Sequence, residues 1–187
     1  MNDQGVDADG IYTIDVAGTP MTVFCDMTRF GGGWTQIYDQ DVDVLSGYLP
    51  TNVWAGGVRT DLPDSGQYSI LNLIDDFVGA SPGFDFLIDW PNDGNDYVRW
   101  TQSENPFVGR GTVTGIDQSP TNQTGCTPFS GLAAEGDGVS TMDGSASTCW
   151  WWAIGTSDAF GSGIPAYKTS ETNGLLVVAT RTRLWVR

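Results

Sequence analysis

The chain has 187 residues, of which 12% are aromatic and 25 are Gly, and 23 Asp and Glu against 8 Lys and Arg give a formal net charge of −15. This length allows a sizeable core, while the negative charge would repel nucleic acid and anionic membranes. The chain contains no His, which excludes His-based zinc sites and Ser-His-Asp catalysis within it. Its longest apolar run, at 174–179, is far too short to span a membrane.

The first regular elements are expected in Tyr12–Ile37, as two strands around a turn, a glycine run and a third strand. Apolar and polar residues alternate around Tyr12 and Ile14, and again before the glycines, which is the pattern of half-buried strands. Turn residues stand between the first two strands at 18–20. Three glycines at 31–33 allow backbone conformations that side chains forbid.

The words DGIYTI, VFCDM and GGGWT in this stretch resemble, in sequence and in spacing, the start of a fibrinogen-related domain. This family includes the ficolins and the intelectins. The resemblance implies an α+β, fibrinogen C-terminal-like fold, with a twisted antiparallel sheet, one main helix and a loop-rich C-terminal lobe. The alternative is that these residues are core strands of some other β-rich domain, and under either interpretation they are scaffold.

The chain has three Cys. In fibrinogen-related domains the residue that matches Cys25 pairs with a Cys upstream of the YTI strand, and this sequence has none there. We therefore expect Cys25 to be a free, buried thiol whose partner lies in a longer precursor, since residues 1–4 show no signal-peptide pattern. Cys126 and Cys149 would then form a disulfide that stabilises by ~3 kcal/mol and implies secretion. Two reduced core cysteines are the alternative.

An acidic cluster follows the third strand, with Asp39, Asp41 and Asp43 at alternate positions. Carboxylate oxygens are the ligands that calcium prefers, so such a cluster can chelate a cation. A solvated acidic turn that ends the strand is the simpler interpretation, and we expect that outcome.

The main helix is expected at about 66–78. Tyr68, Leu71, Ile74 and Val78 recur at helical spacing. Capping residues precede this segment, and Gly and Pro follow it.

A β-hairpin is expected next. Aromatic and aliphatic residues alternate with other residues over 84–90, and a turn-rich segment at 91–96 leads into a partner strand at 97–102. The Asp and Asn residues at its tip resemble a calcium loop in composition only, because no bidentate Glu follows them. The words WTQSENP and VTGI, which come next, are similar to the middle of short fibrinogen-related and intelectin-like domains.

The second half shows little periodicity from 119 to 167. A loop region this long in a compact domain is usually functional. A closing strand is expected at 175–186, with alternate residues from Leu176 to Val186 on one face. We expect a single domain over 1–187, made of N-terminal strands (1–38), a central sheet and helix (39–118), and the loop-rich lobe with its closing strand (119–187).

The segment STMDG at 140–144 resembles the calcium loop of fibrinogen-related domains, and the resemblance implies that Asp143 is a calcium ligand. The family usually has a second Asp two residues later, where this chain has Ser145. A hydroxyl and backbone carbonyls can still coordinate calcium. The resemblance therefore implies Ca²⁺ held within 135–171. The candidate ligands are the acidic and hydroxyl residues Glu135, Asp137, Asp143, Ser145, Asp158 and Glu171.

Three consecutive tryptophans cannot all face one way on an extended chain, so Trp150 and Trp152 share a face. One of these side chains could stack on a sugar, whereas burial of all three in the core is the alternative. Tyr167, Asp158 and Glu171 lie where intelectins place their ligands and are candidates by location.

The known sugar sites of the family do not transfer whole to this sequence. Intelectins use a His, which this chain lacks. Ficolins have an Asn-Lys-Cys-His-like stretch after the aromatics, whereas residues 153–155 here are Ala, Ile and Gly.

The resemblance implies a calcium-dependent, lectin-like carbohydrate-binding module of a secreted or cell-surface protein, with glycans as partners. The alternative is a calcium-stabilised adhesion or structural module that binds protein. We expect no enzyme, because a hydrolase without His would need paired carboxylates and no spacing singles out a pair. Several copies, as in a homo-oligomer, would supply the avidity that a single sugar site lacks.

Overall fold

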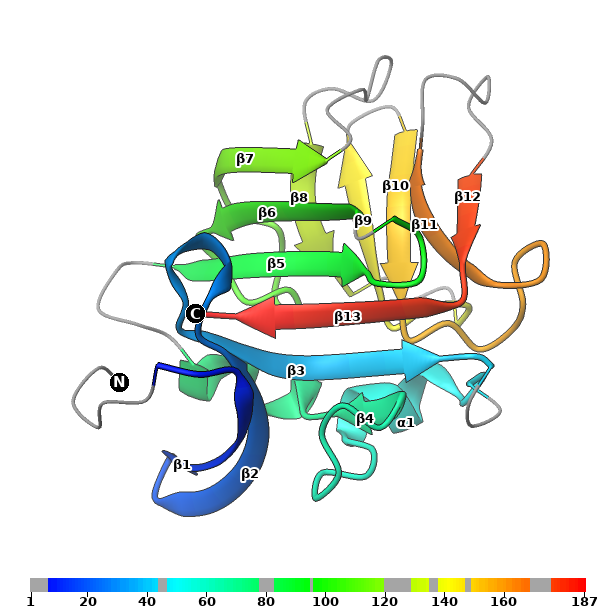
Figure 1. Cartoon of the computed structure of the whole chain (residues 1–187). Coiled ribbons are helices and arrows are strands. Elements are labelled where there is room, and N and C mark those ends of the chain that lie inside the picture. The colour runs from blue at the N-terminus through cyan, green and yellow to red at the C-terminus, as the bar shows by residue number, and fades with distance from the viewer. Residues whose placement is uncertain are drawn as a thin grey trace.

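The computed structural model describes residues 7–43, 47–77, 83–94, 96–119, 129–134, 138–146, 149–168 and 176–187. An antiparallel sheet of eight described strands dominates it (Figure 1). Seven of these strands lie in the order β1-β2-β3-β13-β5-β6-β7, and the short β4 pairs with β3. Among the described residues, no helix is both long and apolar enough to cross a membrane.

The three N-terminal strands confirm the prediction for Tyr12–Ile37. They are β1 (Gly10–Val16), β2 (Thr19–Asp26) and β3 (Trp34–Asp41). The turn between β1 and β2 has positive φ at Ala17 (50°) and Gly18 (84°), as a tight hairpin turn requires. Cys25 is a free thiol with 7% of its surface exposed, as predicted.

The remaining strands of the main sheet are β5 (Phe84–Trp90), β6 (Asp96–Gln102), β7 (Val113–Ser119) and β13 (Arg181–Val186). β5 and β6 form the expected hairpin, with Phe84 opposite Gln102 and Trp90 opposite Asp96. β13 lies between β3 and β5. The last strand of the chain therefore occupies the middle of the sheet.

The single closing strand expected at 175–186 is two strands. β12 (Leu176–Ala179) pairs with β11 (Ile164–Lys168) in a small separate sheet, and β13 enters the main sheet after Thr180. Alternation of apolar residues continues through Thr180, so the pattern alone does not reveal that the chain changes sheets there.

The helix expected at about 66–78 is shorter and of another type. Its first residues form β4 (Gln67–Ser69), because their backbone pairs with β3. A 3₁₀-helix, η2 (Leu71–Phe77), follows and buries three residues spaced by three, Leu71, Ile74 and Phe77. Three residues per turn is the period of a 3₁₀-helix, and over so short a segment this spacing resembles that of an α-helix.

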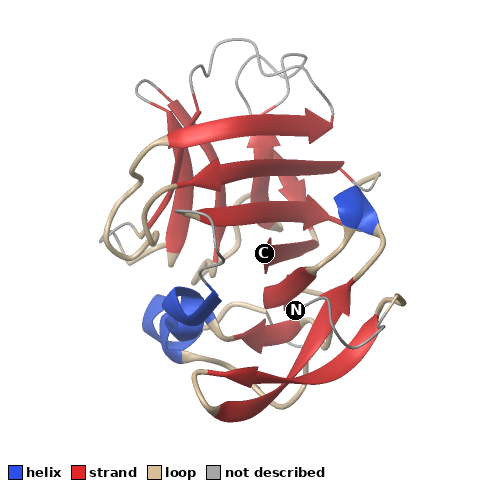
Figure 2. Cartoon of the chain, turned by 90° about the vertical axis from the view of Figure 1, so that its left-hand side faces the viewer, coloured by secondary structure: helices blue, strands red, loops and turns tan. Residues whose placement is uncertain are grey.

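One α-helix occurs among the described residues, α1 (Thr51–Gly56), which was not predicted. The carbonyl of Pro50 accepts hydrogen bonds from the backbone N–H groups of Val53 and Trp54 and so starts the helix. Trp54 is fully buried. In Figure 2, helical segments lie at the lower left of the molecule, and a further one lies at its right-hand edge.

The described part of the lobe after residue 119 is mostly strands, in contrast to the loops expected there. β8 (Phe129–Ala133), β9 (Met142–Ala146) and β10 (Cys149–Ile154) form a sheet in the order β10-β9-β8, behind the main sheet in Figure 1. Register shifts in β8 and β10 interrupt their alternation. These irregularities hide the strands from a search for period two.

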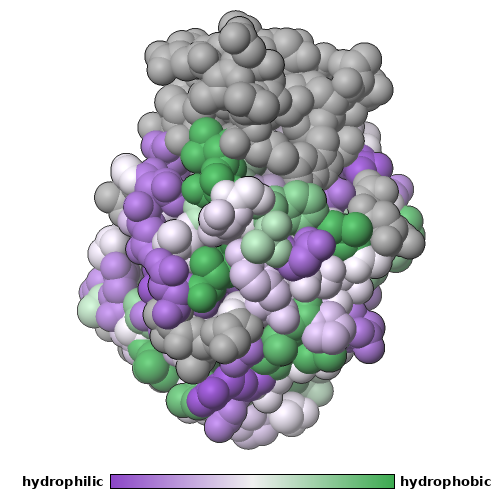
Figure 3. Space-filling view, turned by 90° about the vertical axis from the view of Figure 1, so that its right-hand side faces the viewer, coloured by the Kyte–Doolittle hydropathy of each residue, from purple (hydrophilic) through white to green (hydrophobic). Residues whose placement is uncertain are grey.

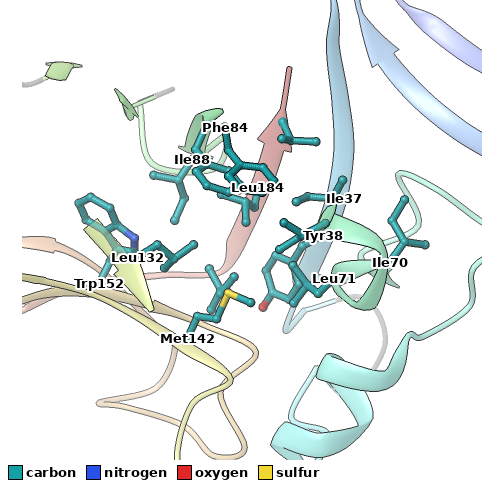
Figure 4. Packing of buried hydrophobic residues seen from close by; sticks show 14 of the residues in the cluster. Ile37, Tyr38, Ile70, Leu71, Phe84, Ile88, Leu132, Met142, Trp152 and Leu184 are labelled. Atoms are coloured by element: carbon teal, nitrogen blue, oxygen red, sulfur yellow. The ribbon is translucent and has the colours of Figure 1, made fainter. Parts of the chain in front are cut away.

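The main core lies between the two sheets and the helical segments. Ile37 and Leu184 of the main sheet, Leu71 of η2, and Met142 and Trp152 of the lobe all belong to it (Figure 4). A second, smaller cluster lies apart from this core and consists of Trp34, Leu87 and Trp185. We call the side of the main sheet that carries this second cluster the outer face.

The acidic cluster after β3 is not the solvated turn that was expected. Asp39 and Asp41 belong to β3 and are buried, and Asp43 alone of the three is exposed. Asp39 accepts two hydrogen bonds from the guanidinium of Arg181. Arg181 of β13 neutralises the carboxylate of Asp39 and so offsets the free-energy cost of burying it.

Candidate functional site

Asp143, the expected calcium ligand, stands at the start of the lobe sheet in β9. Its side chain is buried, and the hydroxyl of Ser140 donates a hydrogen bond to its Oδ1. Thr141, between them, donates its backbone N–H to the carbonyls of Ile154 (3.0 Å) and Gly155 (3.1 Å). Asp143 therefore sits on a firmly hydrogen-bonded stretch of chain.

This stretch is tied to the main sheet through Gly155. The backbone N–H of Gly155 donates to the hydroxyl of Tyr38 at 2.7 Å, and that hydroxyl donates to the side-chain carbonyl of Gln40. Burial raises the pKa of Tyr38 well above its ordinary value, and the charge of Asp39 acts in the same direction. The hydroxyl is therefore neutral and serves as a fixed structural link.

Asp158 lies on the segment that follows and is exposed. Its charge, together with that of Asp43, adds to burial in raising the pKa of Tyr48. Asp158 and Asp43 therefore lie near one tyrosine, although they come from distant parts of the sequence.

Within the described residues, no three His, Cys, Asp or Glu residues come together as metal ligands. Asp143 already accepts a hydrogen bond from Ser140, and it and Asp158 do not make a calcium site by themselves. Three of the candidate ligands, Glu135, Asp137 and Glu171, lie outside the described residues. The side chain of Ser145 lies outside them as well.

Trp152 does not line a surface, which differs from the ligand-binding role expected for it. Its ring is fully buried and lies 4.9 Å from that of Phe129 and 5.7 Å from that of Trp100, centroid to centroid. Gly144 makes this possible, because a Cβ there would lie 2.5 Å from the indole. Trp151 is buried as well.

The remaining candidate residues lie on strands of the lobe or outside the described residues. The backbone of Trp150 belongs to β10 and that of Tyr167 to β11, but their side chains lie outside the description. Cys149 is in the same position, and Cys126 lies outside the described residues altogether, so the disulfide stays a prediction.

The outer face of the main sheet carries a charged network that was not predicted. Arg183 donates to both oxygens of Asp89, at 2.9 and 2.7 Å, and Arg29 joins Asp89 to Asp26. Burial alone would raise the pKa of Asp26, but hydrogen bonds from Arg29 and its charge outweigh burial and lower it. The alternation of Arg181, Arg183 and Trp185 was the signal in the sequence for this face.

A polar pocket of about 190 Å³ opens on the same face. Side chains of β3, β5 and β6 and Arg187 line the pocket, and Gly115 of β7 forms part of its wall.

On the face of the molecule shown in Figure 3, hydrophilic and hydrophobic residues are interspersed over the coloured part.

Comparison with known proteins begins with a negative result, since no family model matches the sequence. A stretch of 35 residues is 60% identical to angiopoietin-4 of Bos taurus; it covers 18% of this chain and only 7% of that relative. The structure is similar to the fibrinogen-like globe domain of human ANGPTL6, with a TM-score of 0.55 and 14% identity over 98% of this chain and 90% of that one. The chain has the fibrinogen-like globe fold.

A second globe domain gives the same result. That of human ANGPTL2 matches with a TM-score of 0.55 and 14% identity over 99% of this chain and 94% of that one. The expected fibrinogen C-terminal-like architecture is therefore confirmed, as a mostly antiparallel sheet with one short α-helix among the described residues.

Proposed function

We propose that this globe domain is the recognition module of a secreted or cell-surface protein and binds glycans in a calcium-dependent manner. The observation that carries the proposal is the fold, because globe domains commonly bind calcium and this chain matches one over 98% of its length. Acidic residues within 135–171 would hold the ion, which suits their oxygen ligands. The ligands would be surface polysaccharides or glycoconjugates.

In this proposal Asp143 anchors the ion-binding segment to the sheet. Its neighbours Ser140 and Thr141 are hydrogen-bonded into the fold, so one end of the segment is already in place before an ion binds. Calcium bound there would offer open coordination positions to sugar hydroxyls. Trp150 and Tyr167 are proposed as aromatic neighbours of the sugar, while Trp152 supports them from the core.

A glycan array probed with the purified chain, in millimolar Ca²⁺ and again in EDTA, tests the proposal. We expect glycans to be retained in calcium and released in EDTA. Retention that survives chelation unchanged would remove the metal from the mechanism. Multimerising the chain on a streptavidin carrier raises sensitivity, because single sugar sites bind weakly and avidity compensates.

A protein-binding adhesion module is the second candidate, and the burial of Trp151 and Trp152 favours it. Both rings face the core, so neither supplies the aromatic wall that a sugar site usually has. In this case calcium would raise the melting temperature of the chain, but no glycan on the array would be retained. The two candidates are therefore separated by the array alone, with the melting curve showing that calcium has bound.

A further inference from the structure

The pocket on the outer face of the main sheet is small, open and polar. It is lined by residues of β3, β5, β6 and β7 and by Arg187, which follows β13. Its volume of about 190 Å³ restricts any ligand to a small molecule. The residues that give it its chemistry are Trp34, Asp85, Arg99, Thr101, Gly115 and Arg187.

Arg187 is held firmly in the wall of the pocket. Its guanidinium lies 4.5 Å from the centroid of the Trp34 ring. Nη1 donates to the carbonyls of Phe30 and Gly32, each at 3.2 Å, and Nη2 donates to Asp85 at 3.3 Å. The side chain is nevertheless 37% exposed. A ligand would therefore meet a cation that is already oriented, at little entropic cost.

Arg99 also lines the pocket, and only part of its guanidinium is engaged in hydrogen bonds. Its Nε donates to Asp117 at 2.7 Å, and its guanidinium lies 4.5 Å from the centroid of the Phe30 ring. A guanidinium carries five N–H donors, and within the described residues the Nη groups of Arg99 have no recorded partner. With 34% of the side chain exposed, these donors are available to an anionic group.

Hydrogen-bond acceptors lie beside these donors. The hydroxyl of Thr101 donates to Asp85 at 2.6 Å, which leaves the lone pairs of its oxygen free to accept. A carboxylate has about four lone-pair sites, so Asp85 can accept from a ligand hydroxyl in addition to Thr101 and Arg187. Gly115 contributes no side chain, and a Cβ at this position would approach Thr101 Oγ1 to 3.9 Å.

Arg99 and Arg187 make this pocket less negative than the chain as a whole. Arg99 is paired with Asp117 and Arg187 with Asp85, so the charge at the pocket is balanced in a chain whose net charge is −15. Five of the chain's eight Lys and Arg residues form ion pairs on this face: Arg29, Arg99, Arg181, Arg183 and Arg187. An acidic ligand would find little positive potential on the rest of such a molecule.

We propose that this pocket binds a hydroxycarboxylate of monosaccharide size, a hexuronic acid unit, without calcium. The carboxylate would pair with Arg99 and Arg187, since guanidinium groups match carboxylates in charge and shape. Hydroxyls of the same sugar would donate to Asp85 and Thr101. The site is separate from the calcium-dependent one proposed above, and either can exist without the other.

Calorimetric titration of the chain with sodium glucuronate in EDTA tests this inference, with glucose and acetate as comparison ligands. We expect glucuronate to bind about tenfold tighter than either, because only it satisfies both the arginines and the acceptors. Arg99→Gln should weaken glucuronate binding about tenfold. The matched control Arg59→Gln, which removes an exposed cation away from the pocket, should leave it unchanged.

Thr101→Val provides a second variant in case Arg99→Gln unfolds, because it is isosteric and keeps a good strand residue. It should weaken glucuronate several-fold and leave acetate unaffected. Binding of glucose as tight as that of glucuronate, equal binding of acetate, insensitivity to both variants, or dependence on calcium would each overturn the inference. Dependence on calcium would instead place the uronate at the metal site.

Discussion

The backbone N–H of Gly155 donates a hydrogen bond of 2.7 Å to the hydroxyl of Tyr38, 117 residues earlier in the chain. Tyr38 belongs to the main sheet, and Gly155 directly follows the lobe strand β10. The bond therefore joins the scaffold to the lobe that carries the candidate calcium ligands. Because both groups are buried, loss of this contact would leave polar atoms unpaired and cost stability.

Gly155→Ala should destabilise the chain by about 2–4 kcal/mol. Gly155 has φ = 62°, where a side chain is strained by about 1–2 kcal/mol. Its Cβ would also lie 2.3 Å from Thr141 Oγ1, and such overpacking costs about 1–3 kcal/mol. Urea denaturation followed by tryptophan fluorescence measures the free energy of unfolding.

Gly161→Ala is the matched control for this variant. Gly161 has nearly the same backbone conformation, with φ = 56°, but no heavy atom lies within 4 Å of its added Cβ. We expect a loss of only about 1 kcal/mol, from backbone strain alone. Equal losses at the two positions would show that the contact with Thr141 does not matter.

Asp39→Asn should destabilise the chain by about 2–4 kcal/mol, because it leaves Arg181 without its buried partner. Asp39 has no exposed surface, and the side chain of Arg181 is 20% exposed and also contacts Asp64, which moderates the loss. Asp117→Asn, in the exposed pair with Arg99, should cost less than about 1 kcal/mol. Thermal and urea unfolding of both variants measure the difference, and a larger cost at Asp117 would contradict the account.

Stability at low pH should depend on Asp26. Its pKa is lower in the folded chain than its ordinary value of 3.8, so the ionised form favours folding. The contribution of Asp26 is therefore present above pH ~4 and is lost as the pH falls through the folded pKa. Melting temperatures from pH 2 to 7 should show a shallower acid limb for Asp26→Asn.

Asp93 serves as the control, because its pKa is shifted in the opposite direction to that of Asp26. Burial and the charge of Asp96 raise its pKa, so its ionised form opposes folding above its ordinary pKa. Asp93→Asn should therefore raise the melting temperature at pH 7 and have little effect below pH ~3. A pH-independent effect of either substitution would show that its charge is not responsible.

Thiol titration should give one reactive thiol per chain in non-reducing denaturant and none in the native state. Cys25 is free and buried, and burial raises its pKa, so native reaction at pH 8 should be slow. The single thiol follows from the predicted bridge between Cys126 and Cys149. Three reactive thiols in denaturant would show that this disulfide does not form.

The strands with local alternation could be predicted from the sequence, because period two is visible in any short segment. Tyr12–Ile37 and the hairpin at 84–102 belong to this class. The break at Thr180 could not be predicted, since the apolar pattern runs through it. Nor could η2, where a period of three is hard to distinguish from 3.6 over seven residues.

The ion pairs of the outer face could not be predicted from local sequence patterns either. Asp39 and Arg181 lie 142 residues apart, and no local pattern links them. An acidic residue at a strand end is usually solvated, so the sequence alone predicts a turn at Asp39. The pocket between Arg99 and Arg187 has the same origin, because it exists only once β13 has entered the sheet between β3 and β5.

The most direct test of the central claim is the reversibility of glycan retention. A glycan selected on the array is immobilised, and the chain is bound to it in about 1 mM calcium, the concentration range of weak extracellular calcium sites. EDTA and then excess calcium are passed over the bound chain. The account predicts release in EDTA and renewed binding in calcium, with the chain folded throughout by circular dichroism. Binding that is unchanged by EDTA, or absent in calcium for every glycan, would contradict it.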